Sequence, residues 1–388
     1  MRISIITVCY NRVETIERTI RSVISQDYEE KEYIIIDGGS SDGTVDIIRR
    51  YEGDLACWIS EKDGGIYEAM NKGIRYATGE VIAFLNSDDW YEDNILAETA
   101  HGFEDAKTQI LCGDVRCHHD GAVSRYRVNR EPEEELRFRM VYWQPAMFVR
   151  RELFERYGGF DTRYRIAADY DWMLRMYDRH IAISLTDRVL TNFSYGGIST
   201  RADMLRVQAE EGRQAALLAL SRNQELSAEQ KEQWKKRIEN EYDRGIENYK
   251  FKKLLKEIAG GDGQMILARV RRAFRNDACE IFGCGMIFRE IGGLLRRLQI
   301  SVAALWDNDP GKWGQRIDGI QIRNPAQLKP GQNTVIIASV DYERQIGLLL
   351  EQKGFKKGED YLPYSELRRR ILRAAEDKGI DQGDVCHK

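Results

Sequence analysis

The chain has 388 residues, which exceeds the roughly 250 to 300 residues at which one hydrophobic core stops growing, so we expect two or three domains. Its composition, 42% hydrophobic and 31% charged, is that of a folded globular protein and excludes a disordered or fibrous chain. With 59 basic and 63 acidic residues the net charge is −4, so no global basic field indicates a nucleic-acid partner, and any anionic ligand must be held locally.

The first two hundred residues alternate short β-type runs with amphipathic helical stretches. ISIITV is followed by a helical pattern from about Val13 to Ser25, and YIIID, LACWIS and VIAFL each precede another helical pattern. This alternation predicts a largely parallel sheet with helices on both faces, and therefore an α/β fold.

A helical connector is predicted from about Arg201 to Asp277, where no proline occurs and charges of both signs are dense. Ser227 and Gln230 have the spacing of a capping box at the start of the helix EQKEQWKKRIENEY. The basic stretch RVRRAFR at the end of this region is a candidate for peripheral contact with an anionic membrane surface, although a solvated face is the commoner role of such a pattern.

After Asp277 the alternation of strands and helices returns, which predicts a small Rossmann-like α/β domain. A strand, a glycine turn, a helix and a second strand ending at Asp307 outline a nucleotide-fold unit, with the aspartate placed as a ribose-binding acid would be. The dinucleotide fingerprint requires three glycines, but Gly283 and Gly285 are followed by Phe288 at the third position. A structural or sugar-binding role is therefore at least as well supported as dinucleotide binding.

The cellular compartment is predicted from the termini and the cysteines. The N-terminal apolar stretch is too short for a signal-peptide core, and no later run approaches the roughly 18 apolar residues of a membrane span. Seven scattered cysteines favour reduced thiols, and the spacing of Cys112, Cys117, His118 and His119 matches no standard zinc pattern. We expect a cytoplasmic protein, with the inner face of the membrane as an alternative location.

Polar residues gather immediately after the apolar runs of the first two hundred residues. Asp37 follows YIII, Asp63 follows WISEK, and Asp88 and Asp89 follow FLNS. Each placement alone has an ordinary explanation in turn chemistry. Because the carboxyl ends of strands line the ligand crevice of an open parallel sheet, the joint placement predicts one shared site.

Asp88 and Asp89 put two carboxylates side by side at the end of a strand. Such carboxylates are hard oxygen ligands suited to Mg²⁺ or Mn²⁺, which take their remaining ligands from water and substrate phosphates. The sequence therefore predicts a metal site for the pyrophosphate of a nucleoside diphosphate.

Three stretches, SIITVCYNRVETIERTIRSVISQ, IIIDGGSSDGT and SEKDGGIYEAMNKGIRYATGEVIAFLNSDDW, resemble the family 2 inverting glycosyltransferases, whose A-type fold is a single nucleotide-binding α/β layer. The resemblance covers roughly residues 1 to 200. It implies that the nucleoside is held by Thr7, Tyr10 and Asp37. It further implies that Asp63 and Asn71 line the nucleotide and sugar-phosphate region.

The same resemblance implies that Asp88 is the main metal ligand, with Asp89 beside it. Many members have an acid where Asn86 stands, so this chain departs from the family pattern at that position. A neutral Asn86 can still accept a hydrogen bond or reach the ion through water, with a lower metal affinity as the expected result.

The segment RIAADYDWMLRMY resembles the part of the family that carries an acidic pair, the second member of which acts as the catalytic base. Ala168 replaces the first acid, Asp169 occupies the base position, and Asp171 is the second candidate. In similar proteins a loop at the position of residues 192–200 can close over the diphosphate, although a terminal turn explains this stretch equally well. Trp143 and Gln144 precede the acceptor region, although a packed core tryptophan is the commoner outcome.

The leading hypothesis is a metal-dependent inverting glycosyltransferase that moves a sugar from a nucleotide sugar, expected to be a UDP-sugar, to a hydroxyl acceptor. The resemblance implies a glycan or lipid-linked acceptor in surface polysaccharide synthesis. The alternatives are an NAD-dependent sugar oxidoreductase acting through the C-terminal domain and a non-catalytic scaffold that binds nucleotide sugars. The expected domains are a catalytic domain at 1–205, the connector at 206–277 and the Rossmann-like domain at 278–388.

Overall fold

A computed structural model describes residues 1–119, 122–128, 133–260, 264–331, 333–339 and 342–376. The chain divides into two compact units, Met1–Ile246 (unit 1) and Glu247–Lys388 (unit 2). Each unit has its own sheet and its own hydrophobic clusters.

Unit 1 is built on a nine-stranded mixed sheet with the order β3-β2-β1-β4-β8-β6-β9-β5, and β7 pairs with β6. Strands β1 to β4 are parallel, as the alternation of strands and helices predicts. β8 runs antiparallel to both β4 and β6, so the rest of the sheet is mixed. The strands are β1 (Ile3–Cys9), β2 (Lys31–Asp37), β3 (Cys57–Ser60), β4 (Val81–Phe84), β5 (Trp90–Tyr91), β6 (Ile110–His119), β7 (Ala122–Tyr126), β8 (Met147–Arg150) and β9 (Ile183–Ser194).

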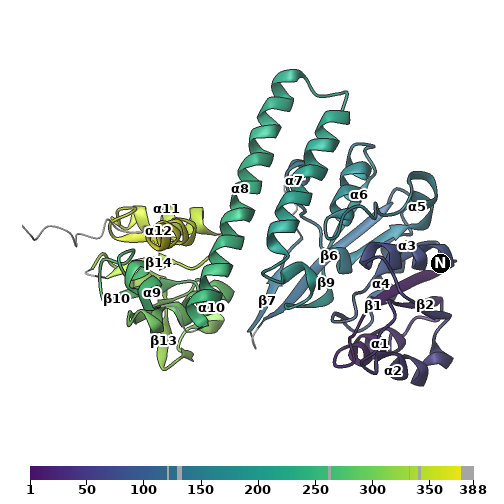
Figure 1. The fold of residues 1–388 in the computed structure, drawn as a ribbon, viewed down its shortest axis with the longest axis horizontal. Helices are drawn as coiled ribbons and strands as arrows, with labels where there is room; N and C mark the ends of the chain where they lie inside the picture. The colour runs from purple at the N-terminus through teal and green to yellow at the C-terminus, as the bar shows by residue number, and fades with distance from the viewer. Residues whose placement is uncertain (120–121, 129–132, 261–263, 332, 340–341, 377–388) are drawn as a thin grey trace, which may run out of the picture. The chain divides into compact units, whose positions relative to one another are not determined.

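Helices pack on both faces of this sheet (Figure 1). β1 illustrates the reason, because all seven of its residues are buried: Ile3 and Ile5 belong to one apolar cluster, and Ile6 and Val8 belong to the other. A strand that is apolar on both sides must be covered on both sides. The helices are α1 (Ile16–Ile24), α2 (Thr44–Arg50) and α4 (Ile95–Gly102) in one cluster, and α3 (Ile66–Tyr76), α5 (Arg151–Tyr157) and α6 (Ala168–Tyr177) in the other.

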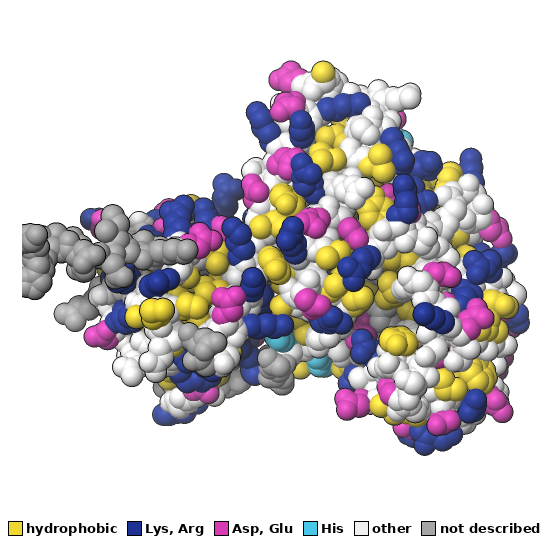
Figure 2. Space-filling view, in the orientation of Figure 1, with side chains coloured by type: hydrophobic (Ala, Val, Ile, Leu, Met, Phe, Trp, Pro, Cys, Tyr) yellow, Lys and Arg dark blue, Asp and Glu magenta, His cyan; other side chains and the backbone are white. Residues whose placement is uncertain are grey.

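The predicted helical region is divided between the two units. α7 (Leu205–Arg222) contributes Ala215, Ala216 and Leu220 to a unit 1 cluster, and α8 (Ala228–Ala259) contributes its first part to unit 1 and its last turns to unit 2. Charges of both signs are interspersed along the exposed sides of these helices (Figure 2). The capping box before α8 is confirmed, since Ser227 N–H donates to Gln230 Oε1 at 2.9 Å and Gln230 N–H donates to Ser227 Oγ at 3.2 Å.

Unit 2 has a six-stranded sheet with the order β12-β13-β11-β10-β14-β15, parallel except for β12. The chain builds outward from β10 on one side through β11 and β13 and on the other through β14 and β15, which is the order of an open doubly wound sheet. The elements are β10 (Ala278–Phe282), β11 (Ser301–Trp306), β12 (Arg316–Ile317), β13 (Ile320–Arg323), β14 (Thr334–Ile337), β15 (Tyr361–Pro363), α9 (Gln264–Arg271), α10 (Met286–Arg297), α11 (Glu343–Gln352) and α12 (Tyr364–Glu376).

The basic stretch RVRRAFR forms the end of α9 and the turn after it. Its apolar side chains face inward: Val270 is fully buried, and Ala273 and Phe274 pack against the unit 2 cluster. Met265, one turn before the stretch on α9, is 73% exposed, and contact of this basic stretch with an anionic membrane surface stays a prediction. Over the described residues, no helix combines the length and the apolar character needed to cross a bilayer.

Candidate active site

The carboxyl ends of β1, β2 and β3 lie side by side at one edge of the unit 1 sheet. The register pairs Cys9 with Asp37 and Asp37 with Ser60, so the segments after these strands start next to one another. These segments also touch, because Gly38 N–H donates to the Cys9 carbonyl at 2.8 Å, and a Cβ at Gly38 would lie 3.5 Å from Asp63 Oδ2. The structure thus brings Asp37 and Asp63 to one edge.

Asp37 is buried and organises the loop that follows β2. Its Oδ2 atom accepts hydrogen bonds from Ser60 Oγ at 2.7 Å, Ser40 N–H at 2.9 Å and Gly39 N–H at 3.1 Å. A carboxylate that accepts several such bonds fixes the backbone around it. The contacts therefore give Asp37 a role in shaping the loop that follows β2.

Two residues of β1 and its end, both expected to hold the nucleoside, lie in different environments. Thr7 is fully buried and its Oγ1 lies 3.0 Å from the hydroxyl of Tyr33, so its side chain is engaged inside the sheet layer, and its contact with a nucleoside stays a prediction. The physical reason is that β1 continues to Cys9, which leaves Thr7 inside the sheet. Tyr10, directly after the strand, is 60% exposed and presents an aromatic ring at the site edge.

Asp63 precedes α3 and forms a buried ion pair with Lys72 on that helix. Lys72 Nζ lies 2.5 Å from Asp63 Oδ1 and 2.6 Å from Glu61 Oε1. Burial acts to lower the pKa of Lys72, but these two carboxylates outweigh it and raise the pKa. Asp63 Oδ2 is buried without a hydrogen-bond partner, so it can accept a bond from a ligand's N–H or O–H group.

Asn71 lies one turn after Tyr67 on α3, and its side chain is hydrogen-bonded to the backbone of the segment that leads to α6. Its Nδ2 donates to the Phe160 carbonyl, and its Oδ1 accepts from Phe160 N–H, both at 2.8 Å. Gly159 is pressed against the same amide, since a Cβ there would lie 2.2 Å from Asn71 Oδ1. These contacts give Asn71 a bracing role and leave its amide only partly available to a nucleotide.

The turn Asn86–Asp89, named the NSDD turn here, follows β4, and Asp88 is its partly exposed acidic side chain. Burial raises the pKa of Asp88, while the positive charges of Arg12 and Arg18 lower it. Asn86 Oδ1, on the same turn, is buried without a hydrogen-bond partner. An accessible carboxylate together with an unsatisfied amide oxygen is the oxygen donor chemistry that Mn²⁺ and Mg²⁺ take, so these residues fit such an ion.

Asp89, the second predicted metal ligand, is buried and engaged by protein. Its Oδ1 accepts from Ser194 N–H at 2.9 Å, its Oδ2 accepts from Asn86 Nδ2 at 3.4 Å, and its carbonyl accepts from Thr19 Oγ1 at 2.7 Å. Burial and the neighbouring Asp88 charge raise its pKa well above the ordinary range. Asp89 thus ties the turn to β9, and Asp88 is the carboxylate that can face an ion. No cluster of three or more His, Cys, Asp or Glu side chains suited to a metal occurs among the described residues.

The segment 192–200 lies against the turn Asn86–Asp89. A Cβ at Gly197 would lie 2.7 Å from Asp88 Oδ2, so this backbone passes directly over the carboxylate. Arg18 links the same parts, because its Nη2 donates to the Asp88 carbonyl at 2.8 Å and to Ser194 Oγ at 3.1 Å, and its guanidinium stacks 3.6 Å from the Trp90 ring. Arg18 was not identified from the sequence, where it is one of several basic residues on a helix.

Asp169 lies in the first turn of α6 with one carboxylate oxygen already engaged. Its Oδ1 accepts from the Tyr67 hydroxyl at 3.0 Å and from Tyr170 N–H at 2.9 Å. Burial raises the pKa of Asp169, and these hydrogen bonds oppose the rise. Asp171, the second candidate base, instead pairs with Arg175 at 3.0 Å, which also donates to backbone carbonyls.

Glu211 on α7 holds the backbone at the start of α6. Its carboxylate accepts from Arg165 N–H at 2.9 Å, Ile166 N–H at 2.9 Å and Ala167 N–H at 3.2 Å. Ala167 is the N-cap of α6, so its N–H has no intrahelical partner, and a carboxylate near a helix N-terminus is favourable. Sequence analysis missed Glu211 because the cap comes from a residue 44 to 46 positions away, with no local signal.

Trp143 packs within unit 1. Its ring lies 4.8 Å from Phe193 and 5.1 Å from Tyr126, measured between ring centroids. Gln144 Nε2 lies 3.2 Å from Met70 Sδ. These contacts describe Trp143 as a packed aromatic, which is the commoner outcome stated above.

The glycine turn of unit 2, at Gly283 and Gly285, is held by contacts with neighbouring residues of the same unit. Asp307 accepts from Cys284 N–H at 3.0 Å and pairs with Lys312 at 3.0 Å, and Gly283 has φ of +102° with a Cβ position 2.9 Å from the Ala338 carbonyl. Asp307, the acid expected to bind a ribose, thus uses one carboxylate oxygen to accept a hydrogen bond from the glycine turn itself. These contacts weaken the dinucleotide interpretation.

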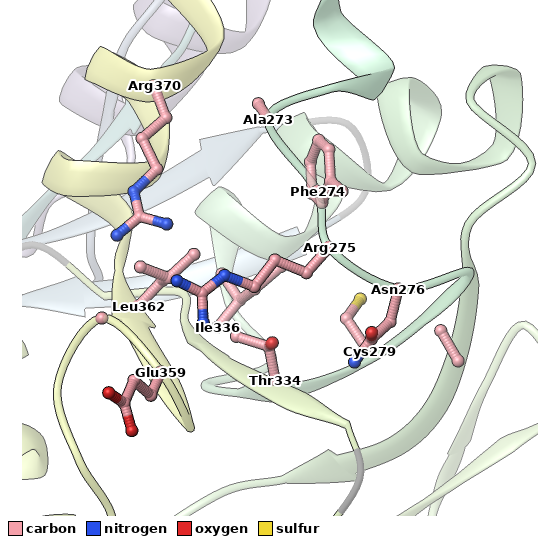
Figure 3. A pocket seen from close by; sticks show the side chains of 12 residues that line it. Ala273, Phe274, Arg275, Asn276, Cys279, Thr334, Ile336, Glu359, Leu362 and Arg370 are labelled. Atoms are coloured by element: carbon pink, nitrogen blue, oxygen red, sulfur yellow. The ribbon is translucent and has the colours of Figure 1, made fainter.

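A small pocket of unit 2 lies at the opposite edge of its sheet, where β10 and β14 begin. Figure 3 shows the side chains of Arg275, from the segment before β10, and Arg370, from α12, directed into it. Arg370 pairs with Glu366 at 2.6 Å. The pocket also has apolar walls, which include Phe274 and Leu362.

The sequence comparisons with known proteins concern about half of this chain. Residues 4–185 match the model of the family described as Glycosyl transferase family 2. An uncharacterized glycosyltransferase of Mycobacterium tuberculosis (strain H37Rv) is 34% identical over 180 residues, which cover 45% of this chain and 68% of that protein. A PGL/p-HBAD biosynthesis glycosyltransferase of Mycobacterium bovis (strain BCG) is 30% identical over 205 residues, covering 50% and 78%.

Solved structures show the same fold. The S. aureus protein TarS, residues 1–349 in complex with UDP, superposes with a TM-score of 0.52 at 18% identity and covers 77% of this chain and 88% of that one. Its complex with UDP-GlcNAc gives a TM-score of 0.51 at 16% identity over the same shares. The fold, the sequence matches and the arrangement of strand ends lead to one conclusion: this chain is a glycosyltransferase that belongs to glycosyl transferase family 2.

Proposed function

We propose that this glycosyltransferase moves a sugar from a nucleotide sugar, with a UDP-sugar as the favoured donor, to a hydroxyl group of a glycan or lipid-linked acceptor, and that the anomeric configuration inverts. The proposal is supported above all by the state of Asp169, a partly buried carboxylate with one oxygen engaged and a raised pKa, in the same unit as the acidic strand ends. The UDP and UDP-GlcNAc complexes of TarS support the nature of the donor.

The chemistry follows from the charges of the site. An acceptor hydroxyl is a poor nucleophile until a carboxylate removes its proton, and such general-base help is worth roughly 10² to 10⁴ in rate. Asp169 takes that proton. A single displacement by the hydroxyl, without a covalent sugar on the protein, inverts the anomeric carbon.

The leaving diphosphate is bound at the other end of the site. Arg12 and Arg18 place positive charge around Asp88, and the backbone of Gly197 covers the same carboxylate. A divalent ion of the Mn²⁺ or Mg²⁺ type, held by Asp88 with Asn86 beside it, would supply Lewis-acid stabilisation of the departing diphosphate. Tyr10 offers an exposed ring on which a nucleobase can stack.

The test is a donor screen followed by base substitution. UDP-, GDP- and dTDP-sugars are titrated calorimetrically with Mn²⁺ present, and hydrolysis or transfer is measured with the donor that binds. Asp169→Asn is expected to keep donor binding and to lose transfer by about 10² to 10⁴. Asp171→Asn is the matched control, because it removes a carboxylate from the same helix that is already paired with Arg175. Equal loss of binding and transfer in Asp169→Asn would refute the base assignment.

A further inference from the structure

One face of α3 contacts the segment that carries Asp169, the proposed base. Tyr67 and Asn71 are four residues apart, so they project from the same side of the helix. Asn71 binds both backbone groups of Phe160, and the Tyr67 hydroxyl donates to Asp169 Oδ1 at 3.0 Å. The Tyr67 ring also packs 5.5 Å from the Phe160 ring, which fixes the direction of the hydroxyl.

The two oxygens of Asp169 differ in their surroundings. Oδ1 accepts from Tyr67 and from Tyr170 N–H, whereas no hydrogen bond from another residue reaches Oδ2 within the described ranges. A carboxylate with one oxygen fully engaged has one oxygen left for a substrate proton. The lone pair that takes the proton is thereby selected before the acceptor arrives.

We propose that Tyr67 is a positioning residue, which fixes Oδ1 of Asp169 and so presents Oδ2 to the acceptor hydroxyl. This inference rests on the proposed function of Asp169 as the general base. Tyr67 itself is 6% exposed, and its hydroxyl donates a hydrogen bond to a carboxylate, so it cannot act as the base. α3 begins directly after the Asp63 turn, so the same helix joins the donor edge to the base.

Charged side chains on the elements packed around α6 pair with other groups, and on the neighbouring 3-10 turn Glu133–Arg137 the Arg137 side chain pairs with Asp178 at 3.4 Å. On α6 itself, Asp171 pairs with Arg175 at 3.0 Å. On α7, Glu211 is bound to the backbone N–H groups of residues 165–167. Tyr67 on α3 is therefore the side chain whose removal should change the proton affinity of Asp169.

The experiment compares Tyr67→Phe with Tyr33→Phe in the full chain. Both variants keep a buried ring and lose one hydroxyl that lies 3.0 Å from its partner, Asp169 in one case and Thr7 in the other. Tyr67→Phe is expected to lower kcat about tenfold, the equivalent of one hydrogen bond to a charged group, with the donor KM unchanged. The acidic limb of its kcat/KM profile should move to higher pH, because the bond that favours the ionised carboxylate is gone.

The outcomes separate this inference from the proposed function. A Tyr67→Phe profile that coincides with the profiles of the unsubstituted chain and Tyr33→Phe, while Asp169→Asn abolishes transfer, overturns the positioning role and leaves the base in place. If Asp169→Asn retains transfer, both assignments fail. If Tyr33→Phe shifts the limb as far as Tyr67→Phe does, the shift is a general effect of losing a buried hydroxyl, and the positioning role is refuted.

Discussion

Replacing Glu211 with alanine is expected to loosen the start of α6 and with it the first turn of the helix, which carries Asp169. The substitution removes an acceptor shared by the N–H groups of Arg165, Ile166 and Ala167, at distances of 2.9 to 3.2 Å. Loss of a helix cap costs about 1 kcal/mol, with a range of 0.5 to 2. Loss of a negative charge near a helix N-terminus adds about 0.3 to 1 kcal/mol.

These terms are not fully additive, because water can reach the freed N–H groups at this half-buried position. We therefore expect the free energy of local opening to fall by about 1.5 kcal/mol, which corresponds to roughly tenfold faster amide exchange. Hydrogen exchange measured by mass spectrometry on peptides that cover residues 163–172 reads this change directly. Transfer activity should fall with donor affinity retained, since the donor edge is untouched.

Glu210→Ala is the matched control on the same helix. Glu210 is an exposed partner of Arg206 at i,i+4, a kind of pair worth about 0.3 to 0.5 kcal/mol. Its removal should leave exchange in 163–172 unchanged. Exchange that rises equally in both variants, or by less than twofold in Glu211→Ala, would show that the three hydrogen bonds do not hold α6.

Two further predictions concern the loop beside Asp88 and the pH dependence of transfer. Gly197→Ala should weaken donor binding severalfold, because a Cβ at this position would lie 2.7 Å from Asp88 Oδ2 and would displace either the carboxylate or the loop. Calorimetry with Mn²⁺ present measures this affinity. An unchanged affinity would mean that the loop moves without affecting the donor site. Burial raises the pKa of Asp169, and in the proposed mechanism this carboxylate must be ionised to accept a proton. We therefore expect kcat/KM to fall with decreasing pH through a midpoint above the ordinary aspartate value of about 3.9. A profile that stays flat down to about pH 4 would contradict this.

Much of the architecture was predictable because it depends on local patterns. The α/β class, the helices on both faces and the capping box of Ser227 and Gln230 all follow from periodicity and short-range spacing, and the structure confirms them. The gathering of polar residues after β1, β2 and β3 was predictable for the same reason, since parallel strands end at one edge. The burial of Thr7 was not predictable, because the end of β1 depends on how far this strand pairs with β2, and the pairing continues to Cys9.

The contacts that refine the site come from residues distant in the sequence. Tyr67 and Asp169 are 102 positions apart, and Glu211 caps backbone 44 to 46 positions before it. Neither contact has a periodic or motif signal in one sequence. The separate environments of Asp88 and Asp89 were hidden as well, because adjacent residues on a turn point in different directions and only packing decides which one is buried.

The tight fit between Gly159 and Asn71 constrains how this protein can vary. Any side chain at 159 would lie within 2.2 Å of the Asn71 amide oxygen, which is itself fixed by Phe160. A larger residue at one position is therefore tolerated only with a smaller one at the other. Across homologues these two sites should change together or not at all, and a library that randomises both should recover active pairs that neither single-site library contains.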